Sequence, residues 1–159
     1  IQAITRRHWT RGLLTLAASM VLLVALGYGA VAINEYVNRP PAVVALQEIE
    51  SAPDAQSATA EISDGGTATA HWSESVGKAV LVSDGLPEIA DDQSFELWFV
   101  RDGAAISAGV FDPAGDDAAT AQLAGAMVPG DVIAVTIEPQ GGSPDGTPSS
   151  DPIVAIPTA

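Results

Sequence analysis

An uncharged apolar run, GLLTLAASMVLLVALGYGAVAI, occupies residues 12–33 and is the feature that most restricts how this chain can fold. As an α-helix, the run would be about 33 Å long at about 1.5 Å per residue, which is enough to cross a hydrocarbon core about 30 Å thick. It is apolar on every face, whereas a helix on the side of a domain core needs only an apolar stripe. We therefore expect one transmembrane α-helix over residues 12–33.

A cleaved signal peptide is the alternative explanation of the same run. Ala30-Val31-Ala32 fits a small-x-small cleavage site. However, the apolar part of a signal peptide is typically about 7–15 residues long, and this run is longer. The length of the run therefore favours a retained span.

Two glycines, Gly27 and Gly29, lie in the outer third of the predicted span. Glycine costs a helix about 1 kcal/mol relative to alanine. The pair is either a small-residue surface for close helix packing or a possible weak point at which an intramembrane protease could unwind the helix. Composition alone favours the first explanation.

Positive charge is concentrated on one side of the predicted span, where three arginines occur without an acid. Because cytoplasmic flanks have the excess of Lys and Arg, we expect a single-pass protein of the cell membrane, with a cytoplasmic N-terminus and lipid bilayer around the span. These arginines are Arg6, Arg7 and Arg11. The predicted segments are a cytoplasmic juxtamembrane stub over 1–11, the transmembrane helix over 12–33, a connector over 34–41 and an extracytoplasmic domain over 42–159.

The part of the chain after the span is strongly acidic. From Pro41 onward it contains two basic and nineteen acidic residues. Nucleic acid is excluded as the expected partner, because phosphate binding relies on clustered Lys and Arg. The chain has no cysteine, so neither disulfides nor thiolate metal sites can form.

Short strand-like segments separated by Gly, Pro, Asp or Ser dominate the acidic part. This spacing predicts an all-β sandwich, antiparallel and immunoglobulin-like (Ig-like), and not alternating α/β units. The predicted strands are Val43–Ile49, Thr59–Ile62, Thr67–Trp72, Lys78–Ser83, Ser94–Arg101, Ala105–Phe111, Ala119–Leu123, Val132–Glu138 and Ile153–Ile156.

A hairpin is predicted over residues 94–111, SFELWFVRDGAAISAGVF. Asp102-Gly103 between two strand-like runs is a two-residue turn signal. Phe95, Leu97 and Phe99 share one face of the first strand, and its other face is also partly apolar. Apolar residues on both faces favour a central position in the sheet.

A loop rich in glycine and proline follows the predicted strand at 132–138 and reads IEPQGGSPDGTPSSDP over residues 137–152. It has no Lys and no helix pattern after it, so it lacks both features of a phosphate-binding loop. Since a strand-like run follows it, we expect it to join the last two strands. Gly141-Gly142 is expected to make a turn with positive φ.

Metal and catalytic motifs are weak. His8 and His71 are expected on opposite sides of the membrane, and residues 112–117, DPAGDD, lack the alternation of a calcium loop. Lys78 with a nearby serine could imitate a Ser–Lys dyad, and His71 with Ser73 a hydrolase triad, but no Gly-x-Ser-x-Gly motif is present. We expect no enzymatic activity, no metal and no cofactor.

Two stretches together resemble the C-terminal domain of anti-sigma-K-type factors from actinobacteria. FELWFVRDGAAISAGVF resembles the Leu-Trp hairpin of that family, and EPQGGS resembles its Glu-Pro-x-Gly-Gly-Ser ending. The family's later Pro-Thr pair appears here as Thr147-Pro148, after an Asp145-Gly146 insertion. The signature residues are Phe95, Glu96, Leu97, Trp98, Gly103, Ala108, Gly109, Phe111, Glu138, Pro139, Gly141, Gly142 and Ser143.

The resemblance implies a membrane-anchored anti-sigma factor. Its expected partners are an extracytoplasmic-function sigma factor, bound by an N-terminal domain outside this chain, and membrane proteases that release the sigma factor stepwise. The external domain would be a sensor, or a shield for a cleavage site near residues 34–60.

Two alternatives remain. One is a single-span accessory subunit that docks on another membrane protein in a larger cell-envelope complex; helical sequence upstream of Ile1 would favour the anti-sigma interpretation over it. The other is a ligand-binding sandwich with Trp72 and Trp98 as its platform, although core positions are expected for both.

Overall fold

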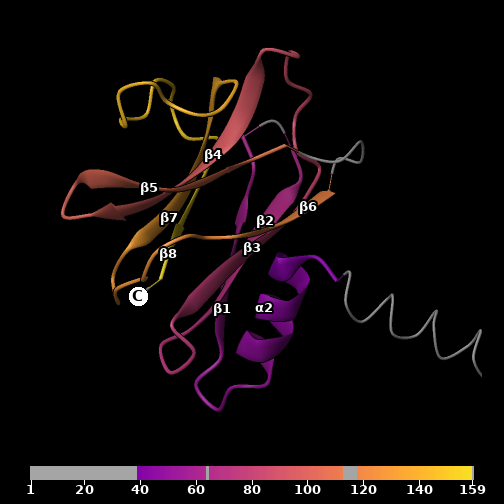
Figure 1. Ribbon diagram of the computed structural model, residues 1–159, viewed down its shortest axis with the longest axis vertical. Coiled ribbons are helices and arrows are strands. Elements are labelled where there is room, and N and C mark those ends of the chain that lie inside the picture. The colour runs from indigo at the N-terminus through magenta and orange to yellow at the C-terminus, as the bar shows by residue number, and fades with distance from the viewer. Residues whose placement is uncertain (1–38, 64, 113–117, 159) are drawn as a thin grey trace, which may run out of the picture. The chain divides into compact units, whose positions relative to one another are not determined.

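The described part of the chain contains eight short strands and one helix (Figure 1). The computed structural model describes residues 39–63, 65–112 and 118–158, and a compact unit begins at Pro40. The elements are α2 (Pro41–Glu50), β1 (Gln56–Glu61), β2 (Thr67–Ser73), β3 (Lys78–Asp84), β4 (Gln93–Arg101), β5 (Ala104–Phe111), β6 (Ala118–Gln122), β7 (Val132–Pro139) and β8 (Val154–Pro157).

The strands form two antiparallel sheets of four strands each. The first sheet has the order β1-β2-β3-β6, and the second has the order β5-β4-β7-β8. Each strand predicted from Thr59 onward is present, with its ends shifted by at most three residues. The expectation of a mainly antiparallel β-structure is therefore confirmed.

One hydrophobic core receives side chains from both sheets. Phe95, Leu97 and Phe99 of β4 point into it, and Trp72 and Leu81 enter from the first sheet. β4 lies between β5 and β7, and its opposite face is also buried. The predicted central position of this strand is confirmed, and Trp72 and Trp98 are both buried, as expected.

Backbone hydrogen bonds link the two sheets along both sides. Ser63 N donates to Ile153 O at 2.9 Å, just after β1 and just before β8. On the other side, Ala124 N donates to Ala108 O at 2.7 Å. Ala108 is free for this bond because a bulge in the β4–β5 pairing, opposite Leu97 and Trp98, leaves it without a cross-strand partner. The signature residue Gly109 lies next to this bulge.

The β4–β5 hairpin has the predicted two-residue turn. Arg101 pairs with Ala104, and φ is 51° at Asp102 and 79° at Gly103. Two positive φ values are typical of the type I′ turn, whose twist matches that of the flanking strands. Gly103 therefore has a conformational role in the hairpin.

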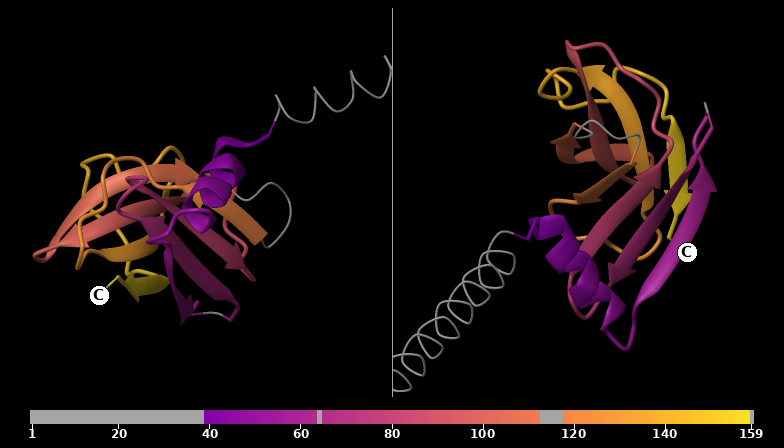
Figure 2. Two further views of the ribbon diagram at one scale, coloured as in Figure 1. Left: turned by 90° about the horizontal axis from the view of Figure 1, so that it is seen from below. Right: turned by 90° about the vertical axis from the view of Figure 1, so that its right-hand side faces the viewer.

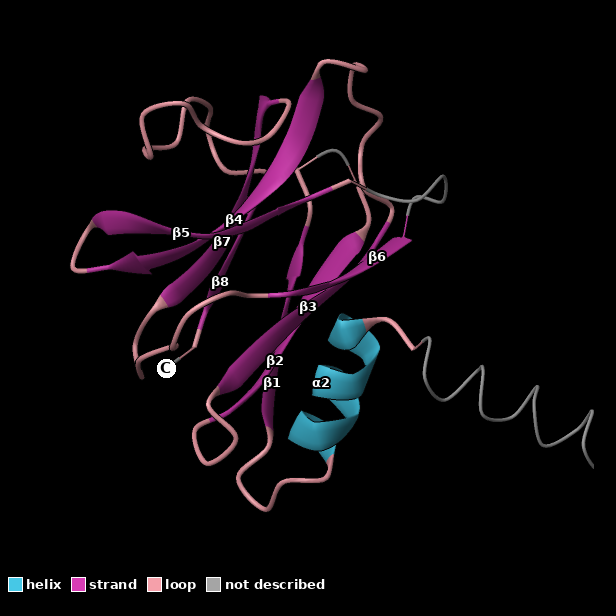
Figure 3. Cartoon of the chain, in the orientation of Figure 1, coloured by secondary structure: helices cyan, strands magenta, loops and turns pink. Residues whose placement is uncertain are grey.

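The strand predicted over Val43–Ile49 is wrong, because these residues lie in α2. Pro41 is its first residue, a position at which the missing N–H costs nothing. Ala45 and Ile49 are four residues apart, so they share one helix face and pack against Val80 of β3. Figure 3 shows α2 beside the strands of the first sheet, and Figure 2 shows the helix from two further sides. An ion pair between Lys78 and Glu48 adds a polar contact.

Several predictions concern residues outside the described ranges. They are the stub at 1–11, the span at 12–33 and most of the connector, with Arg6, Arg7, Arg11, Gly27 and Gly29, and most of the acidic turn at 112–117. Pro41, which was assigned to the connector, begins α2. Among helices built from described residues, none has the length and apolar character needed to cross a membrane.

We predict that Ile49→Ala weakens the docking of α2. Ile49 is 0% exposed, and replacing a buried Ile by Ala costs about 2–5 kcal/mol. The expected result is faster amide hydrogen exchange in residues 41–50 and a lower free energy of unfolding. Val44→Ala is the matched control, since Val44 lies on the same helix and is 38% exposed. Equal exchange rates in the two variants would contradict the proposed packing.

Candidate functional site

The two signature stretches lie side by side on adjacent strands. β4 pairs with β7 so that Ser94 faces Glu138 and Glu96 faces Thr136. We use "outer face" for the side of the second sheet that points away from the shared core. It contains Glu96, Trp98, Ala134, Thr136 and Glu138. Sequence reasoning recognised both stretches but not their contact, which depends on the β4–β7 pairing.

The loop between β7 and β8, residues 140–153, covers part of the outer face. Thr147, Pro148 and Pro152 line a cavity together with Trp98 of β4. Figure 1 shows this orange-yellow segment folded back beside β4. The loop joins the last two strands, as predicted. Because it lies over the outer face, it shields the outer residues of β4 from solvent.

Glu138 is the main attachment point of this loop. It is 1% exposed, and its carboxylate accepts hydrogen bonds from Ser149 N at 3.0 and 3.2 Å and from the Ser149 hydroxyl. The Thr136 hydroxyl donates to it at 2.6 Å, and Trp98 Nε1 donates in turn to the Thr136 oxygen at 2.8 Å. A chain of hydrogen bonds therefore connects β4, β7 and the loop.

These hydrogen bonds keep Glu138 ionised despite its burial. Burial alone raises the pKa of a carboxyl, because it disfavours the charged form. The donors from Ser149 and Thr136 outweigh that effect and hold the pKa of Glu138 below its ordinary value. The negative charge is thus stabilised by neutral donors, and in the described part of the chain no ion pair includes Glu138.

Glu96 holds the first part of the same loop. Ser143 N donates to its Oε2 at 2.7 Å, and the Ser107 hydroxyl of β5 donates to its Oε1 at 2.5 Å. Gly142 passes so close that an added Cβ would lie 2.7 Å from Val110 Cγ2 and 3.0 Å from Glu96 Oε2. Gly141 and Gly142 have φ values of 89° and 97°. The predicted positive-φ turn is confirmed.

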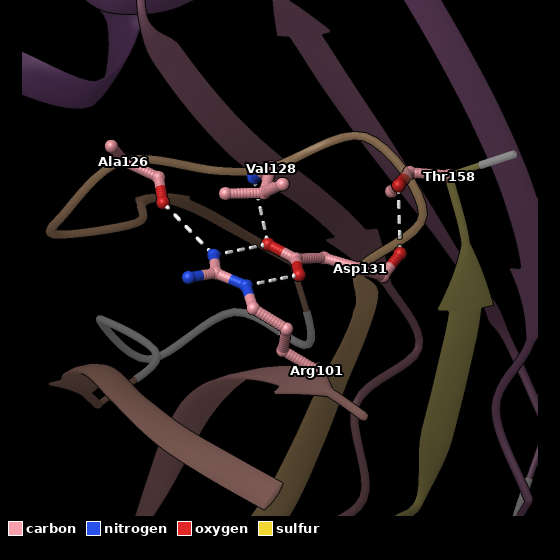
Figure 4. Close-up of polar contacts among 5 residues, drawn as sticks. All are labelled: Arg101, Ala126, Val128, Asp131 and Thr158. Carbon is pink, nitrogen blue, oxygen red and sulfur yellow. Dashed lines mark hydrogen bonds and ion pairs between the residues drawn. The ribbon is translucent and has the colours of Figure 1, made fainter. Parts of the chain in front are cut away.

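A second polar cluster fastens the opposite end of β4 (Figure 4). Arg101 donates from Nε and Nη2 to the two carboxylate oxygens of Asp131 at 2.8 and 2.7 Å. Asp131 Oδ2 also accepts Val128 N at 2.8 Å, and its backbone oxygen accepts the Thr158 hydroxyl at 2.7 Å. Arg101 lowers the pKa of Asp131 more than burial raises it.

Sequence reasoning missed the Arg101–Asp131 pair. Thirty positions separate its members, and no local pattern indicates such a contact. The available signal was that only two basic residues follow Pro41. In an acidic domain, a lone arginine at a strand end was a candidate for a buried carboxylate partner.

Neither the Ser–Lys dyad nor the hydrolase triad considered above is assembled among the described residues. Ser73 and Ser75 both donate to Asp54, at 2.7 and 2.6 Å, and these bonds lower the pKa of Asp54. Lys78 pairs with Glu48 instead of a serine. No group of three potential metal ligands occurs in the ranges that the structure covers.

These features define a class: a mainly antiparallel β-domain whose C-terminal loop is fastened by two buried glutamates. The chain belongs to the family described as "Anti-sigma-K factor rskA, C-terminal", whose model matches residues 13–153. The resemblance noted from the two signature stretches is confirmed.

Individual relatives agree with this assignment. The chain is 36% identical over 117 residues to an "uncharacterized protein in phr 5'region" of Streptomyces griseus, covering 72% of this chain and 48% of the relative. It is 28% identical over 120 residues to anti-sigma-K factor RskA of Mycolicibacterium vanbaalenii, covering 76% and 50%, and 26% identical over 136 residues to RskA of Mycobacterium sp. strain KMS, covering 86% and 54%. The chain spans about half the length of these relatives. No solved structure matches it significantly.

We predict that Gly142→Val destabilises the domain more than Gly141→Val. Both positions have positive φ, and a left-handed backbone costs a non-glycine residue about 1–2 kcal/mol. Only Gly142 also lacks room for a side chain, which adds about 1–3 kcal/mol of overpacking. Chemical denaturation of the two variants measures the difference. An unchanged melting temperature for Gly142→Val would refute the close approach to Glu96.

We predict that acid weakens the domain through Glu138 and Asp131. Because their folded pKa values lie below the ordinary 4.5 and 3.8, the stability that they contribute is complete above those values and is lost as pH falls through the folded values. The free energy of unfolding should therefore decline below about pH 4.5.

Glu138→Gln tests the contribution of the glutamate. We expect lower stability at pH 7, by about 1–3 kcal/mol for a mispaired buried group, and a shallower decline in acid. Glu61→Gln removes the same charge from an exposed position on β1 and is the control. A decline as steep in Glu138→Gln as in the unmodified protein would exclude Glu138 as a source of the acid sensitivity.

Proposed function

We propose that this chain is the transmembrane and external portion of a membrane-anchored anti-sigma factor. Its partner would be an extracytoplasmic-function sigma factor, controlled through regulated proteolysis. The observation that supports this most directly is the family match over residues 13–153, together with relatives described as anti-sigma-K factors. Since the chain spans about half of those relatives, sigma binding would belong to the remaining half.

We further propose that the two sheets form an Ig-like sandwich. The strand pairing supports this, because the chain crosses between sheets from β3 to β4, from β5 to β6 and from β6 to β7, while β3 pairs with β6 and β4 with β7. Pairing between strands that are not consecutive is typical of the Greek-key connections of immunoglobulin-like domains. Side chains of both sheets in one core also fit this arrangement.

In this proposal, residues 12–33 anchor the chain in the cell membrane. Arg6, Arg7 and Arg11 would lie on the cytoplasmic side, by the excess of positive charge on that flank. The acidic domain would then lie outside the cell. We propose no catalytic role for it, since Ser73, Ser75 and Lys78 are engaged with acidic partners.

Helix α2 gives the shield hypothesis a specific form. The cleavage site was expected near residues 34–60, and within that range Pro41–Glu50 is helical and β1 begins at Gln56. Proteases cleave extended, accessible backbone, so cleavage within 41–50 would require α2 to leave β3 and unfold. The folded domain would thereby restrain the first cleavage by holding α2 through Ile49 and Ala45.

Deleting residues 60–159 from the full-length gene tests this proposal. The deletion removes β3, against which α2 packs, so the expected result is constitutive release of the sigma factor and high activity of a reporter that depends on it. Ile49→Ala should raise reporter activity in the same direction, and Val44→Ala should not. Unchanged repression by the deletion variant would count against the shield hypothesis. Reporter activity that stays the same when the whole gene is deleted would count against the anti-sigma role.

A further inference from the structure

A cavity of about 510 Å³ opens on the outer face of the second sheet. Its size lies within the range of about 300–1,000 Å³ that is typical of small-molecule sites. Trp98 and Ala134 form its base, and Val100 and Ala105 line one side. The β7–β8 loop supplies the opposite wall through Thr147, Pro148 and Pro152. One wall of this half-open cavity is therefore the same loop that Glu96 and Glu138 hold in place.

The polar groups in these walls already have partners within the protein. Trp98 Nε1 donates to Thr136 Oγ1 at 2.8 Å, and that hydroxyl donates to Glu138 at 2.6 Å. The Thr147 hydroxyl donates to Asp145 at 2.9 Å. The remaining lining is apolar, and no lining residue is charged. An occupant would thus be held mainly by burial of apolar surface, which favours an aromatic or aliphatic body.

The surroundings of the cavity are acidic. Asp102 precedes the lining residue Gly103, Asp151 precedes Pro152, and Asp145 is two residues from Thr147; all three aspartates are exposed. The hydrogen bonds from Thr147 and Ser143 lower the pKa of Asp145, so it is charged at neutral pH. The acidic residues after Pro41 far outnumber the basic ones. Such a field attracts cations and repels anions.

We propose that this cavity binds a small cationic amphiphile, with the apolar body over Trp98 and the positive group toward the aspartates of the rim. The apolar walls favour a ligand with an apolar body, and the negative charge of the three aspartates favours a positively charged group on the ligand. This inference depends on the cavity alone and does not require the anti-sigma role. It also differs from an exposed tryptophan platform, because Trp98 is 0% exposed to solvent and lies beneath the surface of the cavity.

Fluorine NMR of the full chain provides a direct test. The full chain is labelled with 5-fluorotryptophan at its three tryptophans. It is then placed in phosphatidylcholine nanodiscs. Trp98 reports on the cavity, and Trp72 in the shared core is an internal control. Three probes share one ring system and differ in the charge of the polar group: 2-naphthylmethyl-trimethylammonium is cationic, 2-naphthalenemethanol is neutral and 2-naphthoate is anionic. We expect the Trp98 signal to shift with affinities in the order cation, neutral probe, anion, while the Trp72 signal stays unchanged.

Two sets of variants separate the walls from the rim. Ala105→Phe places a ring in the cavity and should abolish binding of all three probes. Ile106→Phe is its control, because Ile106 is 44% exposed, points to the other side of β5 and does not line the cavity. Asp102→Asn with Asp151→Asn should weaken binding of the cation about twofold to fivefold, as for exposed charge pairs, and leave the neutral probe unaffected.

Three results would overturn the proposal. The first is a Trp98 signal that does not respond to the cationic probe at millimolar concentration. The second is binding of 2-naphthoate as tight as that of the cation. The third is unchanged binding in Ala105→Phe, which would show that the probes bind elsewhere.

Discussion

The burial of two carboxylates on one face of a sheet is the constraint on which much of this domain depends. A charge removed from water must recover its lost hydration from other donors. Glu138 recovers it from Ser149 and Thr136, and Glu96 from Ser143 and Ser107. The donors in the loop are available only when the chain after β7 folds back over the sheet. The loop is therefore held against the sheet by these hydrogen bonds, although it contains neither helix nor strand.

The signature stretches acquire a physical meaning from this arrangement. The aromatic and leucine positions of β4 fill the core, and Glu96 on the same strand faces outward to hold the loop. Gly142 has no side chain because Glu96 and Val110 occupy the space that a Cβ would need. Residues far apart in the sequence thus form one structural unit. The same unit supplies one wall of the cavity over Trp98, so the proposed ligand site depends on the fastening of the loop.

Polar fastening recurs at other points of the domain. Arg101 and Asp131 tie the end of β4 to the turn before β7 and, through the Asp131 backbone, to Thr158. Asp54 ties the turn after α2 to Ser73 and Ser75. By contrast, α2 is held by a small apolar cluster and one ion pair. A thin interface of this kind makes α2 the element most suited to respond before the whole domain unfolds.

The sequence by itself determined the strands from Thr59 onward, the Asp102-Gly103 hairpin, the Gly141-Gly142 turn and the family, because alternation and turn residues act over a few positions. It did not determine α2, since the β-branched residues in Val43–Ile49 suit a strand, whereas in the fold Ala45 and Ile49 pack as one helix face against Val80. The contacts of Arg101 with Asp131 and of Glu96 with Ser143 join residues 30 and 47 positions apart. Only the tertiary structure decides such contacts, because the free energy of a buried charge depends on which distant donors the fold brings to it.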